Sequence, residues 1–328
     1  VIALRAFTNI LLVFLFTACT SVPDERMTSY VDFPETRELT ARTLSLDSAL
    51  FRYPYRVRVQ DDKAVVLDLH GTEYFFHAFH YPGFHYLSSF GKRGDAPEEM
   101  LSAENLRWNG NFLWTLDSNK SELTRLGFAS SGDSLLRLEA VSLDEELLRA
   151  LDFVQYDDST FIIPDYSGDG RFCLVSRQGK LLRKIGTVPT ANEDALKSAR
   201  PALAQAWRSF IDYNPRNGVL AAATQLGEVL EIYNLKDSTH IVRIGPNGEP
   251  EFQISQGYGI PIGIMGFSDI QVTDSAIYVV FQGRAFKDIM QKAQQGINLP
   301  DGGQNIYVFS LEGKPLRKYV LDHYIHGI

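Results

Sequence analysis

The first pattern that could do chemistry is a run of oxygen-bearing side chains. Asp165, Ser167 and Asp169 alternate and Gly170 follows them, as at the start of a calcium-binding loop, where oxygens at alternate positions converge on the ion. The last ligand of such a loop is a bidentate glutamate, and Ser176 stands at that position here. Two interpretations follow: a calcium site at Asp165, Ser167 and Asp169, or a plain hairpin loop without a cofactor.

Three histidines, His77, His80 and His85, also lie close together in the sequence. Successive side chains of a strand point to opposite faces, so His77 and His80 cannot share a zinc ion unless a bulge intervenes. We therefore predict no zinc site at these histidines.

Aromatic and arginine side chains on loops are the candidates for ligand binding, because rigid rings and bidentate donors give affinity at a small entropic cost. For each tryptophan the alternative is a position in the core. No Gly-x-Ser-x-Gly, His-Glu-x-x-His or phosphate-binding loop occurs, so we assign no catalytic residue. The ligand-binding candidates are Arg52, Tyr55, Arg56, Trp108, Trp207, Tyr258 and Arg284.

The composition limits the class of protein. Hydrophobic residues make up 45% and charged residues 22%, which is typical of a folded, soluble domain. The 32 Lys and Arg residues against 40 Asp and Glu residues give a net charge of −8, and no basic stripe is present, which argues against a nucleic-acid partner. The 15 Tyr and 21 Phe residues favour strands and an all-β fold.

The beginning of the chain has the pattern of a lipoprotein signal peptide, residues 1–18. Arg5 precedes an apolar run that is too short to span a bilayer comfortably, and small residues come just before Cys19. We predict lipidation at Cys19, a linker over residues 19–36, and a membrane as partner through this anchor. The expected location is the cell envelope, as an outer-membrane lipoprotein on the periplasmic side or the cell surface. Cys173 would be the remaining cysteine, expected as a buried thiol.

One structural unit repeats along residues 37–328. A strand enters a tight polar turn and a second strand leaves it, with Asp61, Asn109 and Asp157 at equal intervals and further turns at Asn217 and Asp274. A second hairpin follows each of these, which gives units of four strands. Such units at intervals of about 45–60 residues are the signature of propeller blades.

Two longer intervals contain insertions with helical spacing, at residues 192–209 and 284–295, with Pro201 expected to break the first and Gly296 to end the second. Residues 322–328 are similar to the first strand of another blade, and residues 37–47 alternate as a strand that could join the last blade from outside. We therefore predict an all-β, six-bladed propeller of four-stranded blades, whose last blade is incomplete in this chain.

Three segments support this architecture by resemblance to a known family. The segments at 33–39, 67–75 and 90–98 resemble the TolB-like six-bladed β-propeller lipoproteins of Bacteroidetes. The resemblance implies fold and compartment, and it offers no catalytic residues to transfer.

Three functions remain open from the sequence. The leading hypothesis is a binding or interaction module that takes a glycan, a cell-wall fragment or a protein partner. The alternatives are a metal-dependent propeller enzyme, lactonase-like or a glycan lyase, with its site in the central channel, and a scaffold subunit of an envelope complex. The channel enzyme requires several Asp, Asn, Glu or His side chains from different blades that point toward one axis.

Overall fold

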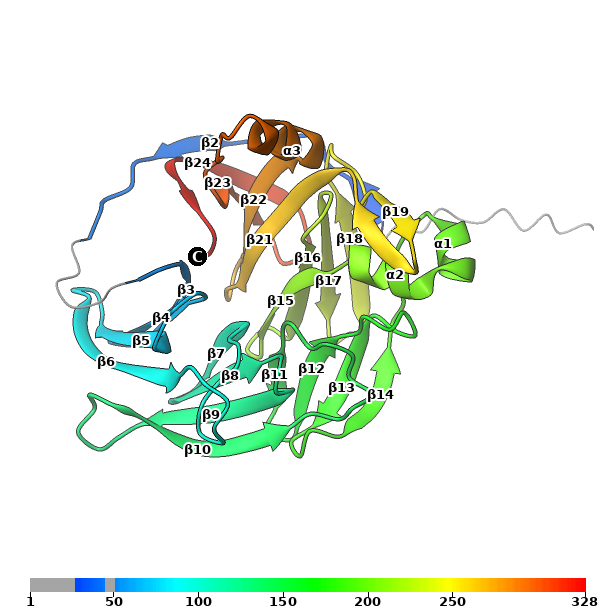
Figure 1. Cartoon of the computed structure of the whole chain (residues 1–328). Coiled ribbons are helices and arrows are strands. Elements are labelled where there is room, and N and C mark those ends of the chain that lie inside the picture. The colour runs from blue at the N-terminus through cyan, green and yellow to red at the C-terminus, as the bar shows by residue number, and fades with distance from the viewer. Residues whose placement is uncertain (1–26, 45–50) are drawn as a thin grey trace, which may run out of the picture.

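Each blade is built from two consecutive hairpins, and the first blade shows the rule. Its strands β3 (Pro54–Gln60), β4 (Lys63–Asp68), β5 (Tyr74–His80) and β6 (His85–Lys92) pair antiparallel in chain order. The computed structural model describes residues 27–44 and 51–328 and contains five such sheets there, arranged around a central axis (Figure 1). The fold is therefore an all-β propeller with four-stranded blades, as predicted. The second to fifth blades consist of β7 (Asn105–Asn109), β8 (Phe112–Asp117), β9 (Glu122–Phe128) and β10 (Leu135–Ser142); β11 (Val154–Asp157), β12 (Thr160–Pro164), β13 (Phe172–Ser176) and β14 (Leu181–Ile185); β15 (Ser209–Asn214), β16 (Val219–Thr224), β17 (Val229–Asn234) and β18 (Thr239–Ile244); β21 (Ile264–Val272), β22 (Ile277–Ala285), β23 (Gly303–Phe309) and β24 (Pro315–Ile325).

The polar turns predicted from the sequence join the two inner strands of each blade. In the first, second and fourth blades the turn contains a residue with left-handed backbone, Asp61 at φ 52°, Gly110 at φ 55° and Gly218 at φ 80°. Asp and Gly adopt this conformation more readily than other residues. These residues therefore allow the tight connection between the two inner strands of the blade.

The hydrophobic core lies between neighbouring blades. Each sheet is apolar on both faces, so it must pack against a sheet on either side. Trp114 and Leu116 of the second blade, for example, contact Phe161 and Ile163 of the third blade in one buried cluster. Separate clusters join the first blade to the second, the third to the fourth and the fourth to the fifth.

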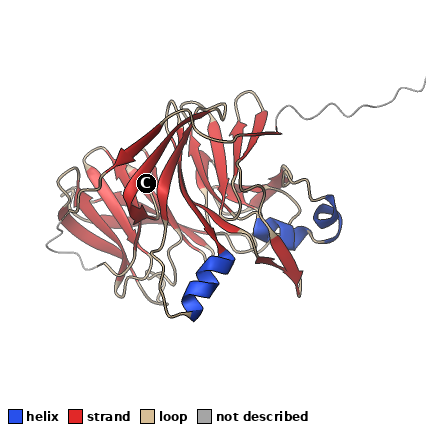
Figure 2. Ribbon diagram, turned by 90° about the horizontal axis from the view of Figure 1, so that it is seen from above, coloured by secondary structure: helices blue, strands red, loops and turns tan. Residues whose placement is uncertain are grey.

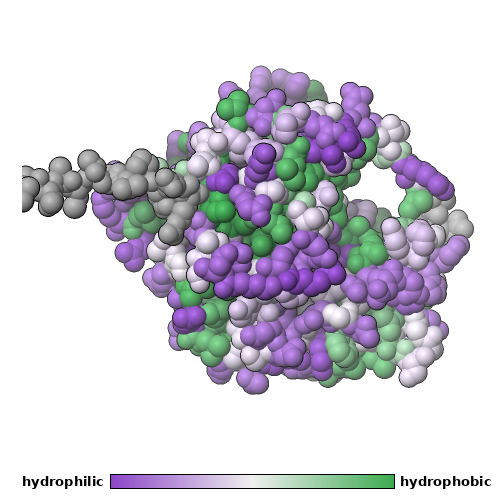
Figure 3. Space-filling view, turned by 180° about the vertical axis from the view of Figure 1, so that it is seen from behind, coloured by the Kyte–Doolittle hydropathy of each residue, from purple (hydrophilic) through white to green (hydrophobic). Residues whose placement is uncertain are grey.

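An opening separates the fifth blade from the first, and the C-terminal end lies in it (Figure 1). A small apolar cluster that includes Val66 and Phe79 covers the face of the first blade on this side. Between this face and Ile325 of β24 lies a cavity of about 390 Å³. The space-filling view shows the opening from behind, with apolar side chains on its rim (Figure 3).

Residues 27–36 belong to the propeller, which corrects the predicted linker for these residues, whereas residues 19–26 lie outside the described part of the chain. β1 (Met27–Ser29) pairs parallel with β18, and β2 (Thr36–Leu39) pairs parallel with β24. Between the two strands, Tyr30 and Phe33 are each 8% exposed in the core of the fourth and fifth blades. The prediction that a strand within residues 37–47 joins the last blade from outside is confirmed for its first residues.

The end of the chain differs from the prediction. We expected residues 322–328 to begin another blade, but as far as Ile325 they continue β24 of the fifth blade. At the end of this strand Ile325 still pairs with Gly303 of β23. Beyond it, Ile328 lies between the inner strands of the first and fifth blades, where its carbonyl accepts hydrogen bonds from Arg58 and Gln271.

Three insertions lie on one face of the propeller, the face at which the inner strands begin (Figure 2). They are the helix pair α1 (Glu193–Ser198) and α2 (Arg200–Ala206), the hairpin β19 (Phe252–Ser255) and β20 (Tyr258–Pro261), and α3 (Phe286–Gln294).

Both helical insertions were predicted, but the first one breaks at a different residue. The chain bends at Ala199, and Pro201 sits in the first turn of α2, where proline is tolerated because no backbone hydrogen bond is lost there. In the second insertion Gly296, with φ 73°, follows α3 as expected. In the described part of the chain no helix has the length and apolarity needed to cross a membrane.

The role of residues 27–36 can be tested with Phe33. Replacing a buried Phe with Ala should lower the free energy of unfolding by about 3–5 kcal/mol. The matched control is Val31→Ala, because Val31 is 85% exposed and should change stability by less than about 0.5 kcal/mol. Urea unfolding measures both, and equal, small effects of the two substitutions would show that the segment is a linker after all.

Candidate functional site

The inner strands of the blades direct charged side chains at alternate positions into the central channel. Arg56 and Arg58 come from β3, Arg107 from β7, Asp212 from β15 and Asp269 from β21. Alternation along a strand sends every second side chain to the same face. All except Asp212 are less than one-tenth exposed, so charges of both signs are buried together in the channel.

Asp269 joins the fifth blade to the first. Its carboxylate accepts two hydrogen bonds from Arg58, at 2.9 and 3.0 Å, and one from Arg56 at 3.1 Å. Burial raises the pKa of Asp269, but the charges of Arg58 and Arg56 outweigh this effect and lower that pKa to about 2. Asp269 is therefore ionised at neutral pH, and its charge is matched by buried guanidinium groups.

Arg107 joins the second blade to the third and fourth. Its Nη1 donates to Asp212 Oδ1 at 2.8 Å and its Nη2 to Asp152 Oδ1 at 3.2 Å. The other oxygen of Asp212 accepts from the backbone N–H of Val272 in the fifth blade, at 2.6 Å. Burial raises the pKa of Asp212 although Arg107 opposes this shift. These contacts connect inner strands of four blades.

At the end of the channel where the inner strands finish, three cavities meet at Trp108. Their volumes are about 500, 210 and 370 Å³, and Trp108 lines each of them. The indole is held in place, because Nε1 donates to the carbonyl of Arg58 at 3.2 Å and the ring stacks on Phe128 with centroids 6.3 Å apart. Trp108 thus offers a fixed aromatic surface at the channel mouth.

The structure separates the residues predicted to bind a ligand. Trp108 lies at the mouth, whereas Arg56 is buried inside the channel, between the rings of Tyr55 and Phe210. Tyr55 is half-buried near the beginning of β3 and lines the cavity at the opening. Trp207 is 0% exposed in a core cluster, so the prediction of a ligand contact is wrong for this residue and the core alternative holds.

The remaining three candidates are not near Trp108. Arg52 is exposed just before β3. Tyr258, on β20, and Arg284, on β22 next to α3, lie at the face that carries the insertions. Arg284 donates to the carbonyls of Pro300 and Gly302. The sequence candidates therefore do not form one site.

The loop predicted as a possible calcium site encloses a lysine. Lys184 Nζ lies 3.5 Å from Asp165 Oδ1 and 3.2 Å from Asp169 Oδ2, and donates to Ser167 Oγ at 2.6 Å. An ammonium group thus stands where the calcium hypothesis places the ion, and this favours the hairpin-loop interpretation. Among the described residues, no group of three or more His, Cys, Asp or Glu side chains could hold a metal.

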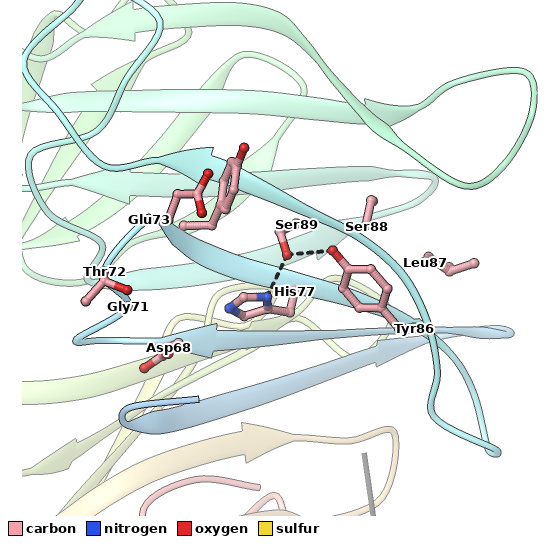
Figure 4. Close-up of a pocket in the computed structure, with 10 residues that line it drawn as sticks. Asp68, Gly71, Thr72, Glu73, His77, Tyr86, Leu87, Ser88 and Ser89 are labelled. Carbon is pink, nitrogen blue, oxygen red and sulfur yellow. Dashed lines mark hydrogen bonds between the residues drawn. The ribbon is translucent and has the colours of Figure 1, made fainter. Parts of the chain in front are cut away.

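A second recess, of about 550 Å³, lies on the first blade outside the channel (Figure 4). There His77 Nδ1 is 2.8 Å from Ser89 Oγ, which is also 2.8 Å from the hydroxyl of Tyr86. His80 has a different neighbour, Lys63, whose Nζ is 3.3 Å from its Nδ1. The two histidines therefore have separate partners. Cys173 is buried, which raises the pKa of its thiol to about 12, so it is not a nucleophile at neutral pH.

The fold and the channel define this chain as a β-propeller. Residues 32–328 match the TolB-like 6-blade propeller-like family, and the chain belongs to this family. Its structure is similar to that of a Bacteroides fragilis protein described as exported, with a TM-score of 0.51 and 11% identity over 90% of this chain and 80% of that one. It is also similar to a DUF4221 family member from Bacteroides vulgatus, with a TM-score of 0.50 and 8% identity over 83% of each chain. At these identities the likeness concerns the fold alone. No curated protein matches the sequence.

Most of the channel residues were not among the candidates predicted from the sequence; Arg56 was the exception. The signal was present, because polar residues recur at alternate positions of the inner strands, as Arg56 and Arg58 do in β3 and Asp212 and Asn214 do in β15. A strand buried on both faces has no other reason for such polar positions. Which arginine pairs with which aspartate depends on the ring and could not be read from one strand.

The importance of the Asp269 network can be tested by Asp269→Asn. Two buried arginines lose their counter-charge, so the free energy of unfolding at pH 7 should fall by about 3–5 kcal/mol. The pKa of Asp269 is lower in the folded protein than in the unfolded chain, so the stability that its charge supplies is present above pH ~4 and is lost as the pH falls toward 2.

The difference between wild type and Asp269→Asn should therefore shrink by about 2 kcal/mol between pH 5 and pH 2. Urea unfolding at both pH values measures it. An equal difference at pH 5 and pH 2 would contradict the assigned pKa of Asp269.

Proposed function

We propose that this protein is a lipid-anchored module of the cell envelope that binds an extended polar ligand at the channel mouth. The ligand classes that fit an envelope location are a glycan, a cell-wall fragment and a protein segment. The observation that carries the proposal is the meeting of three cavities at one fixed aromatic side chain, Trp108. Concave sites with a few oriented polar groups around an aromatic anchor are typical of binding sites.

The chemistry of the channel favours binding over catalysis. Asp152, Asp212 and Asp269 each pair with an arginine, so these carboxylates are not available as a general acid and base pair or as metal ligands. Partially exposed groups surround Trp108 instead and can exchange hydrogen bonds with a ligand. The exported relative and the family match are consistent with an envelope location. Cys19, the proposed anchor, lies outside the described residues.

Binding at the mouth predicts a strong dependence on Trp108. Trp108→Ala should weaken binding of a soluble cell-wall fragment, a disaccharide with a peptide stem, by at least about tenfold, because a central aromatic anchor contributes about 2 kcal/mol. Isothermal titration calorimetry with this fragment, a neutral oligosaccharide and a peptide panel measures the effect on each ligand that binds.

Tyr258→Ala is the matched control, since Tyr258 is 60% exposed on the opposite face. Trp108→Phe retains an aromatic surface and should keep most of the affinity. Loss of binding in Tyr258→Ala with full binding in Trp108→Ala would place the site on the face of the insertions and overturn the proposal.

The anchor makes an independent prediction. In an expression host with a lipoprotein pathway, the wild-type chain should incorporate labelled palmitate and sediment with membranes, because an acyl chain tethers a soluble domain to the bilayer. Cys19→Ser should abolish both, and Cys173→Ser should change neither. Incorporation that persists in Cys19→Ser would contradict lipidation at this residue.

A further inference from the structure

The smallest of the three cavities at Trp108 is rich in hydrogen-bond acceptors. It encloses about 210 Å³ between the turn that follows β11 and the end of β15. The carboxylates of Asp157 and Asp158 and the side-chain amide of Gln155 line it, and so do the rings of Tyr156 and Tyr213, whose centroids are 5.6 Å apart. Carboxylates beside aromatic faces are the groups that attract a cation.

One acceptor in this cavity has no donor. Gln155 Nε2 donates to the backbone carbonyl of Asp157 at 3.0 Å, which fixes the orientation of the amide. The opposite atom, Oε1, is buried and receives no hydrogen bond from the residues that the structure describes. A buried acceptor without a partner is unfavourable by about 1–3 kcal/mol. Because this atom is buried, a ligand in the cavity meets it only when the Gln155 side chain turns toward the ligand.

The carboxylates of Asp157 and Asp158 at the cavity have no ion-pair partner among the described residues. Arg107 also lines it, but its guanidinium is bound to Asp152 and Asp212. No described lysine or arginine forms an ion pair with Asp157 or Asp158.

The nearest arginine on the β13 side, Arg177, bonds to a backbone group of the turn, and the charges of Glu139 and Asp158 raise its pKa. It donates to the carbonyl of Asp158 at 3.3 Å and pairs its charge with Glu139 at 2.6 Å. Burial opposes ionisation of Asp157, but hydrogen bonds from Ser159 lower the pKa of its carboxyl. Asp157 is thus charged at neutral pH.

On the other side of Trp108 the cavity has one apolar wall. This cavity of about 370 Å³ is lined by Phe112, Phe128 and Leu138 together with Trp108, and its remaining side chains are polar: Gln60, Asp61, Asp62, Lys63 and Asn111. Phe112 is 39% and Leu138 47% exposed, so both can still bury apolar surface against a ligand, which is favourable by roughly 25 cal/mol per Å². The indole of Trp108 therefore separates an acidic recess from a recess with an apolar wall.

We infer that the ligand of the channel mouth is a peptide segment in which a basic side chain is followed by an apolar one. The basic group enters the recess of Gln155, Asp157 and Asp158, and the apolar group covers Phe112 and Leu138. The peptide backbone crosses the face of Trp108. This inference rests on the proposed function, because it specifies the ligand of the same site. It selects a protein segment over a neutral glycan, since a glycan supplies no cation.

The test uses the purified chain and short, terminally blocked peptides in calorimetry. The probe contains one lysine followed by one leucine, and its partner peptide contains acetyl-lysine, which keeps the alkyl chain and one N–H donor but has no charge. We expect the lysine peptide to bind at least tenfold more tightly than the acetyl-lysine peptide. Asp157→Asn/Asp158→Asn should remove this difference and leave the affinity for the acetyl-lysine peptide unchanged.

A matched control changes the net charge equally at distant, exposed positions. Asp133→Asn/Asp288→Asn removes the same number of charges away from the cavity and should keep the full preference for lysine. Circular dichroism melts check that both double variants remain folded, and asparagine at 157 can still accept the hydrogen bonds of Ser159.

The outcomes separate this inference from the proposed function. Two outcomes would overturn the inference and leave the binding site in place. The first is equal affinity for the two peptides, and the second is binding of a neutral oligosaccharide alone, provided in each case that Trp108→Ala abolishes the binding. If no probe shows binding that depends on Trp108, both the inference and the proposed function fail.

Discussion

The physical constraint on which the structure depends is the neutralisation of charge inside the channel. Arg56 and Arg58 of β3 pair with Asp269, Arg107 of β7 pairs with Asp152 and Asp212, and all of these residues except Asp212 are buried. Removing such ions from water costs several kcal/mol each, and the cost is recovered only when every charge meets its partner in good geometry. One arrangement of the blades satisfies this condition, in which Arg107 reaches the third and fourth blades and Asp269 reaches the first.

This arrangement also explains why the mouth can serve as a binding site. The apolar clusters between blades hold the sheets together, and the ion pairs fix the inner strands at the axis. Trp108 follows Arg107 directly in β7, and its Nε1 is bound to the carbonyl of Arg58, itself a member of the network. The aromatic surface is therefore positioned before any ligand arrives, and such preorganisation reduces the entropic cost of binding.

The sequence predicted local features well and features that depend on the ring poorly. The hairpin turns at Asp61 and Asn109 and the helical insertions follow from the local preferences of a few residues, and the structure contains them. The status of Trp207 was left open, because a tryptophan near a helical insertion can face either solvent or core, and only packing against the fourth blade decides.

The calcium-like loop shows the same limit. Asp165 and Asp169 have the spacing of metal ligands, but Lys184, which comes from the far side of the hairpin, supplies the cation. Contacts between residues distant in the sequence therefore determine both the core and the site, and a single sequence does not reveal them.

The most direct test of the central claim, that ligands bind at the channel mouth, is fluorine NMR of the protein labelled with 5-fluorotryptophan. The sequence contains 3 Trp residues; Trp108 lies at the mouth, and Trp114 and Trp207 are buried. Titration with a bound ligand should shift the resonance of Trp108 and leave that of Trp207 unchanged. A ligand that binds without moving the Trp108 resonance would contradict the account.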